Sequence, residues 1–232
     1  MKTLICRVAF ACLLPFSAMG ASISGKIVFE GEPPAMKTID MGGDPVCHSK
    51  HTEPMKDEAL VLGEGQTMAN ILVRVSKGLP AKEYPVPTEP VVLTQEGCRY
   101  APHVFAAMKG QDIKLLNPDG TVHNIHGFPK VNKEFNKTMV KTMTETVISF
   151  DKAETMFRLK CDMHPWMMAF CAVMDHPYFD ITATDGLYSI EGLEPGEYEI
   201  EAWHERLGTQ TATVTVTADG AKDVNFVFAR KK

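Results

Sequence analysis

Apolar and polar residues alternate in short stretches along most of this chain. An alternation with a period of two predicts half-buried β-strands, and it becomes more regular after residue 175. Helical periodicity is nearly absent, so the chain is predicted to be all-β. The stretches expected to form strands are residues 23–29, 71–75, 113–116, 142–150, 156–160, 187–190, 198–203, 209–217 and 224–228.

Two β-sandwiches are expected rather than one. About 210 residues follow residue 20, and this length exceeds what one small sandwich needs. The strand pattern breaks at Pro177, because proline cannot donate to a sheet ladder. We therefore expect one domain over residues 88–175 and another over residues 176–232. Residues 21–87 are expected to hold a first strand and an irregular segment.

The first twenty residues have the pattern of a cleavable signal peptide. Lys2 and Arg7 give a positive start, the residues from Leu4 to Phe16 are mostly apolar, and small residues at Ala18 and Gly20 suit cleavage before Ala21. The apolar run is too short to span a membrane, and no later run approaches the required length. The chain is therefore expected to be exported, to the periplasm or beyond, without a membrane span.

The charge of the chain argues against one class of partner. Its formal net charge is −5, and no stripe of basic residues is present. A nucleic-acid role is therefore not expected, because such proteins attract phosphates with clustered Lys and Arg. The acidity suits docking to a positively charged redox partner, although solubility alone explains it as well. The oligomeric state is left open.

Four side chains of metal-binding type stand out from this background. Cys161, His164 and Met167 fall within seven residues, and His123 lies upstream. One thiolate, two imidazoles and a weak axial thioether are typical of a mononuclear electron-transfer copper site. Zinc is the alternative ion, because a Cys and two His with an open position also suit it. Met168 is the rival axial ligand.

The order of these residues predicts how they meet. Cys161 and His164 are expected on a tight loop between two strands, with His123 at a neighbouring strand end. Hydrogen bonds of Asn124 would tether the two segments. His164, beside Pro165 and Trp166, is expected to be the exposed edge through which a partner exchanges electrons.

At these residues the chain resembles the cupredoxin superfamily. The resemblance rests on Asn-x-Asp-x-x-x-His-Asn at 117–124 and Cys-x-x-His-x-x-Met at 161–167, and covers residues 88–175. The second motif is also similar to exported bacterial proteins labelled methylamine-utilisation or plastocyanin-like. In those proteins a cupredoxin segment is joined to a carboxypeptidase-regulatory-like sandwich, and the glycine-rich pattern at 185–198 is similar to that module.

The resemblance implies a fold and a ligand set. It implies a cupredoxin Greek-key sandwich inserted after the first strand of a small Ig-like or transthyretin-like β-sandwich. It also implies one type 1-like copper ion held by His123, Cys161, His164 and Met167. Plastocyanin-type loops place the Met five residues after the second His, whereas Met167 follows His164 by three. That spacing is similar to the copper loop of cytochrome oxidase subunit two, but its second Cys is missing here, which argues against a dinuclear site.

The remaining cysteines are assigned by exclusion. If Cys161 binds metal, Cys47 and Cys98 are the natural disulfide pair in an oxidising compartment. Cys171 lies in an apolar run and is expected to stay a buried thiol. A Cys161–Cys171 bridge is the competing pairing, and it would abolish the metal site.

A one-electron carrier that exchanges electrons with a periplasmic redox protein is the function these features favour. A copper-handling or storage module is the first alternative, since seven of the fourteen methionines lie between residues 139 and 174. A surface-binding module is the second. An enzyme is not expected, because no second catalytic constellation accompanies the metal ligands. Weaker metal-binding candidates are His48, His51, His103, His126 and His204.

Overall fold

The computed structural model describes residues 20–230. The predicted signal peptide therefore lies almost wholly outside the described residues. The described chain consists of strands joined by loops, with one short α-helix and one 3-10 turn, so the all-β prediction is confirmed. Within it, no helix is long and apolar enough to cross a membrane.

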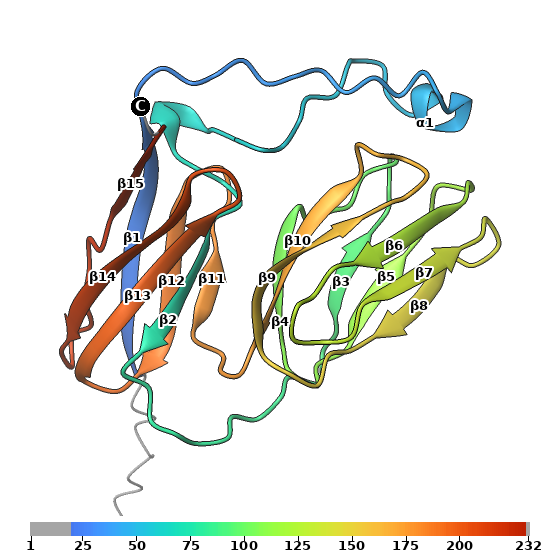
Figure 1. Cartoon of the computed structure of the whole chain (residues 1–232). Coiled ribbons are helices and arrows are strands. Elements are labelled where there is room, and N and C mark those ends of the chain that lie inside the picture. Colours follow the sequence, from blue (N-terminus) through green and yellow to red (C-terminus); the bar gives the residue numbers. More distant parts are fainter. Residues whose placement is uncertain (1–19, 231–232) are drawn as a thin grey trace, which may run out of the picture.

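The strands form two sandwiches side by side (Figure 1). What we call the terminal sandwich pairs the sheet β12-β1-β15 with the sheet β11-β2-β13-β14. Tyr198, Ile200 and Ala202 of β13 point into its core while Glu199 and Glu201 face outward, as strand alternation requires. Its strands are β1 (Ala21–Glu30), β2 (Leu72–Lys77), β11 (Phe179–Ile181), β12 (Leu187–Leu193), β13 (Gly196–His204), β14 (Gly208–Val216) and β15 (Phe226–Ala229).

The central sandwich is built from the chain between β2 and β11. Its sheets are β4-β10-β9-β6-β7 and β3-β5-β8, and β10 lies parallel to β4 but antiparallel to β9. Sequence-distant strands thus become neighbours, which brings the start of β6 beside the loop after β9. Its strands are β3 (Val91–Thr94), β4 (Val104–Met108), β5 (Ile113–Leu116), β6 (His123–Gly127), β7 (Phe135–Met139), β8 (Glu145–Ile148), β9 (Glu154–Lys160) and β10 (Met168–Met174).

The two sandwiches share a buried contact. Leu72 of β2 packs with Ala106 of β4 and Ala172 of β10 in a small apolar cluster. All five residues of β4 are buried, because one face of this strand meets the central core and the other meets the terminal sandwich. His103 and Glu205 add an ion pair of 2.7 Å across the same junction.

The segment between β1 and β2, residues 31–71, crosses from one sandwich to the other and back. We call it the strap. Figure 1 shows it leaving β1, running to α1 (Pro45–Ser49) beside the central sandwich and returning to η1 (Glu64–Gln66) near β1. Asp44 caps α1 by accepting from the backbone N–H of Val46 and Cys47 at 2.8 and 3.1 Å.

A disulfide fastens the strap to the central sandwich. Cys47 of α1 is bonded to Cys98, with the two Cα atoms 5.5 Å apart. The predicted pairing is therefore confirmed. Cys161 and Cys171 are both free, so the competing bridge does not form.

Candidate metal centre

Three of the predicted ligands meet at one end of the central sandwich. His123 is the first residue of β6, and Cys161 and His164 lie on the loop between β9 and β10. One donor atom from each residue falls within 4.8 Å of the other two. Their exposed fractions are 0%, 1% and 4%, so water is kept away from all three.

Backbone and side-chain hydrogen bonds shape the loop. The N–H of Cys161 donates to the carbonyl of Met167 at 3.1 Å, and the N–H of Met167 donates to the carbonyl of His164 at 2.9 Å. Asn124 Oδ1 accepts from the N–H of Asp162 at 2.8 Å and lies 3.2 Å from Cys161 Sγ. Asn124 therefore ties β6 to the loop, in the role the sequence predicted.

The two imidazoles face each other through the same nitrogen. His123 Nδ1 lies 2.9 Å from His164 Nδ1, which is itself 3.6 Å from Cys161 Sγ. The opposite nitrogens are both held by carboxylates: His123 Nε2 by Asp119 at 2.9 Å, and His164 Nε2 by Asp44 at 3.0 Å. With each Nε2 donating to a carboxylate, both Nδ1 lone pairs converge on one space beside the sulfur.

Asp119 is itself firmly held. Its carboxylate accepts from the backbone N–H of Gly97 and Cys98 at 2.8 and 2.7 Å and pairs with Lys50 of the strap at 2.9 Å. Burial raises its pKa, but the bonds to His123, Lys50 and these amides outweigh burial and lower the pKa to about 2. Asp119 is thus an anion behind His123 at neutral pH.

The surroundings of the site favour positive charge. Burial lowers the pKa of His123, but its bonds to Asp119 and Cys161 outweigh burial and raise it. Burial raises the pKa of Cys161, but the His123 ring and the amides of Asn124, His164 and Met163 lower it to about 7. Surroundings that stabilise a thiolate and favour a proton on imidazole also favour a metal cation.

Met167, not Met168, has the burial expected of an axial ligand. Met167 is 1% exposed and belongs to the same core cluster as Cys161, whereas Met168 is half-buried at the start of β10. A thioether is a weak ligand, so it must be kept out of water to contribute. Burial therefore favours Met167.

The donor set fits a soft metal ion of the copper or zinc type. The Nδ1 atoms of two imidazoles and one cysteine sulfur converge in a dry site, and a carboxylate holds the Nε2 atom of each ring. The fit rests on residues from four separate parts of the chain: the strap, the loop between β5 and β6, β6 itself, and the β9–β10 loop.

One expectation is wrong. His164 was expected to be an exposed edge for electron exchange, but it is 4% exposed. Asp44 covers its Nε2, Cys47 Sγ lies 3.7 Å from the same nitrogen, and Trp166 packs with its ring centroid 5.1 Å away. Trp166 lies over the site, and its Nε1 donates to the carbonyl of Cys98 at 3.0 Å.

The weaker metal candidates lie elsewhere or serve packing. His126 bonds Asp162 and Glu134 on the outer side of β6. His103 pairs with Glu205, and the ring of His204 accepts from two backbone amides, so both rings serve structural roles. His51 bonds the carbonyl of Gly97 at 2.7 Å. Within residues 20–230 none of these belongs to the three-ligand cluster.

Sequence reasoning missed the carboxylates and the strap lysine. Asp119 stands in the Asn-x-Asp-x-x-x-His-Asn motif, so its position four residues before His123 was a usable signal. Asp44 and Lys50 offered none, because they lie in an irregular segment far from both histidines in sequence. Only their closeness to Cys47 connects them with the site.

Comparisons with known proteins give likenesses among solved structures alone, since no family model and no curated protein matches. A copper(I) form of a mutant amicyanin is 17% identical, with a TM-score of 0.34, over 44% of this chain and 98% of amicyanin. Amicyanin from Paracoccus versutus (Thiobacillus versutus) is 24% identical, with a TM-score of 0.32, over 44% and 97%.

A larger copper protein is similar over a fraction of its length. The copper-containing nitrite reductase of Thermus scotoductus is 20% identical, with a TM-score of 0.34, over 44% of this chain and 25% of that enzyme. This chain thus matches about a quarter of the reductase. Scores this low assign no family, so the residues of the site must carry any conclusion about function.

Proposed function

We propose that this chain is an exported mononuclear copper protein of the cupredoxin type that carries one electron at a time. His123, Cys161 and His164 would hold the ion, with Met167 as the weak axial ligand. The convergence of both Nδ1 atoms with the Cys161 sulfur is the observation that supports it. When bound, copper would supply a one-electron couple between Cu(I) and Cu(II).

The chain's own residues suit this task. Asp119 and Asp44 hold the two rings in one orientation, so little rearrangement is needed when the charge at the site changes. The lowered pKa of Cys161 provides a thiolate near neutral pH. Burial of all three donors keeps water from the site, which limits solvent reorganisation during electron transfer.

Other parts of the proposal rest on the sequence. The signal-peptide pattern supports export to the periplasm, where a redox protein would be the partner. The terminal sandwich is proposed to be a carboxypeptidase-regulatory-like module without enzymatic activity. Tyr188 and Tyr198 of this sandwich are 3% and 5% exposed, so these two residues belong to the core and are not available as an aromatic binding surface.

Copper storage is the weaker proposal. The methionine-rich region suggested it, but Met139, Met167 and Met174 are at most 2% exposed and pack in apolar cores, and the two exposed methionines, Met143 and Met163, lie on different loops. Buried thioethers of this kind fill core space and are not arranged on a surface for copper exchange. Zinc binding in the same three-ligand site remains the alternative that spectroscopy must separate.

The visible spectrum of the protein with one equivalent of Cu(II) tests the proposal. An intense thiolate-to-copper band that bleaches reversibly on reduction is expected, and it should vanish in Cys161→Ser. Cys171→Ser is the matched control, because Cys171 is a buried free thiol outside the site, and it should keep the band. Tight binding of Cu(I) without a reversible band would favour storage, and zinc binding in preference to copper would refute a redox role.

A further inference from the structure

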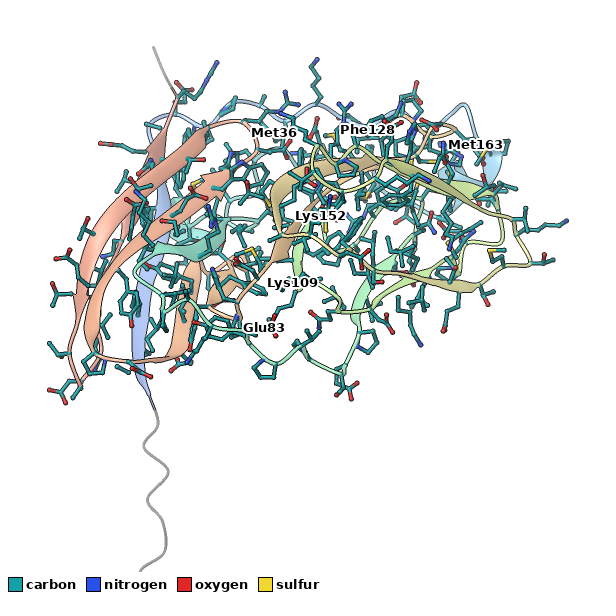
Figure 2. All side chains as sticks on the ribbon, turned by 60° about the horizontal axis from the view of Figure 1, so that its bottom comes forward. Met36, Glu83, Lys109, Phe128, Lys152 and Met163 are labelled. Atoms are coloured by element: carbon teal, nitrogen blue, oxygen red, sulfur yellow. A yellow bond between two sulfur atoms is a disulfide. The ribbon has the colours of Figure 1, made fainter. Side chains whose placement is uncertain are left out.

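A cavity lies between the strap and the terminal sandwich, and none of the residues of the candidate metal centre lines it. Its volume is about 730 Å³, which is within the range of small-molecule sites in proteins. Figure 2 shows Met36, one of the lining residues, on the strap beside the terminal sandwich, whereas Met163 of the ligand loop lies toward the far end of the central sandwich. The cavity is therefore separate from the candidate metal centre.

The two arms of the strap form one wall of the cavity. The N–H of Asp57 on the returning arm donates to the carbonyl of Lys37 on the outgoing arm at 2.9 Å, and the N–H of Ile39 donates to the carbonyl of Met55 at 2.8 Å. These bonds make the arms a paired wall and not two separate loops. The turn between β13 and β14 and the end of β15 complete the lining.

Part of the lining is apolar. Phe29 of β1 is 3% exposed and belongs to the core of the terminal sandwich. Leu60 of the strap and Leu207 of the turn are half-buried, and both pack against the same core. An apolar group that displaces water from these side chains would bind favourably.

The charged part of the lining is mainly positive. Lys37, Arg206 and Arg230 line the cavity together with one carboxylate, Asp57, which accepts from a backbone N–H at 2.8 Å. The nearest carboxylate of Arg206 is Glu205 at 3.6 Å, and Lys37 and Arg230 take part in no ion pair within residues 20–230. The lining thus carries more positive than negative charge, in a chain whose formal net charge is −5.

His204 adds a hydrogen-bond donor to this lining. Its ring is 3% exposed, and its Nδ1 accepts from the N–H of Arg206 and the N–H of Leu207, each at 3.2 Å. Burial lowers the pKa of His204 to about 4, so at pH 7 the ring is neutral and carries its one proton on Nε2. That Nε2 has no hydrogen-bond partner within residues 20–230, although the ring lines the cavity. A buried donor without a partner in the chain favours an acceptor from a ligand.

We propose that this cavity binds a small organic anion, a carboxylate or sulfonate with an apolar body. The acid group accepts from His204 Nε2 and pairs with the three cations, while the apolar body covers Phe29 and the two leucines. A metal cation does not suit a lining with this charge, and an inorganic anion would leave the apolar part uncovered. The proposal does not depend on copper binding.

Fluorescence titration of the metal-free protein with anilinonaphthalene sulfonate, an aromatic sulfonate, tests the cavity. Lys37→Gln and Arg206→Gln should each raise its Kd about tenfold, because each removes one charge-assisted contact. Ala35→Trp, which places an indole against the cavity, should abolish binding. Lys141→Gln is the matched control, because Lys141 is exposed on the central sandwich and outside the cavity, and it should change Kd by less than about twofold. Equal binding by all four variants would overturn the proposal.

Displacement of the probe tests the chemical class of the ligand. Decanoate should displace it, whereas decanol, which has the same chain without the charge, and inorganic phosphate should not do so at the same concentration. Decanoate should also raise the pKa of His204 in a nuclear magnetic resonance titration, because an anion that accepts from Nε2 favours the charged ring. Equal displacement by decanol, or an unchanged His204 pKa, would refute the anion site. Displacement by anionic lipid vesicles but not by decanoate would assign the surface to a membrane and overturn the proposal.

Discussion

Removing the Cys47–Cys98 disulfide should show how much the strap depends on its cross-link. In the double variant Cys47→Ala, Cys98→Ala the strap would keep two polar contacts to the site, Asp44 with His164 and Lys50 with Asp119. The chain-entropy model gives the cost, because the bond closes a loop with a sequence separation of 51. For a loop of that length the model predicts about 4 kcal/mol of lost stability.

Packing adds to this cost. Both cysteines are 0% exposed, so each substitution also removes a buried sulfur, at about 1 kcal/mol apiece. Alanine is preferred to serine because it places no unpaired hydroxyl in the core. The expected total is therefore about 6 kcal/mol, of which about two thirds belongs to the cross-link.

Urea denaturation followed by circular dichroism, without reductant, measures the change in unfolding free energy. Cys171→Ala is the matched control, because Cys171 is an equally buried cysteine without a bond partner. Twice the cost of Cys171→Ala gives the packing share of the double variant. If the double variant loses no more than that share, the disulfide does not stabilise the fold through the loop it closes, and the reasoning is refuted.

Three further predictions concern charged groups. Asp119→Asn should reduce the loss of thermal stability in acid. The pKa of Asp119 in the folded protein, about 2, lies below the ordinary carboxyl value of about 3.9, so its contribution to stability is complete above about pH 3.9 and is lost as the pH falls toward 2. Burial lowers the pKa of His103, but the hydrogen bond and charge of Glu205 outweigh burial and raise the pKa. The contribution of this ion pair to folding stability is therefore complete below about pH 6.5 and is lost as the pH rises through the raised pKa. Glu205→Gln should cost about 3–5 kcal/mol in thermal melts at the acidic end of that range and abolish this dependence; an unchanged profile would contradict it. The thiolate absorbance of the metal-free protein should titrate near pH 7 and disappear in Cys161→Ser, whereas a midpoint near 9.0 would show that the site does not activate the thiol.

Most of the strands that the sequence predicted have one buried and one exposed face, although β2 was predicted and is buried on both faces, and β7 alternates and was missed. β13 is an example, because its buried tyrosine and isoleucine alternate with outward glutamates. β4 and β10 were missed because they are buried on both faces where the sandwiches meet, so no alternation marks them. The predicted strand over 142–150 shrinks to Glu145–Ile148, since a tight turn closed by the N–H of Met143 on the carbonyl of Val140 precedes it.

The candidate site was predictable where its residues are close in sequence. Cys161 and His164 share a loop, and loop spacing constrains geometry directly. His123 was predictable from its motif, in which Asn124 follows it directly. Asn124 accepts a hydrogen bond from the N–H of Asp162, and this bond places His123 beside the loop. The closure of His164 was not predictable, because it depends on Asp44 from a segment 120 residues away. No local pattern records where such a segment packs.

The strap gives the terminal sandwich a physical role at the candidate metal site. The strap begins where β1 ends and finishes where β2 begins. These two strands lie in different sheets of the terminal sandwich, so the core of that sandwich fixes both ends of the strap. If this segment were free at both ends, it would lose much conformational entropy on holding Asp44 and Lys50 against the central sandwich. Anchoring both ends and adding the disulfide removes most of that cost before a metal binds. The terminal sandwich therefore acts as the support for half of the groups that orient the two histidines, and the unit competent for the proposed chemistry is the pair of sandwiches together.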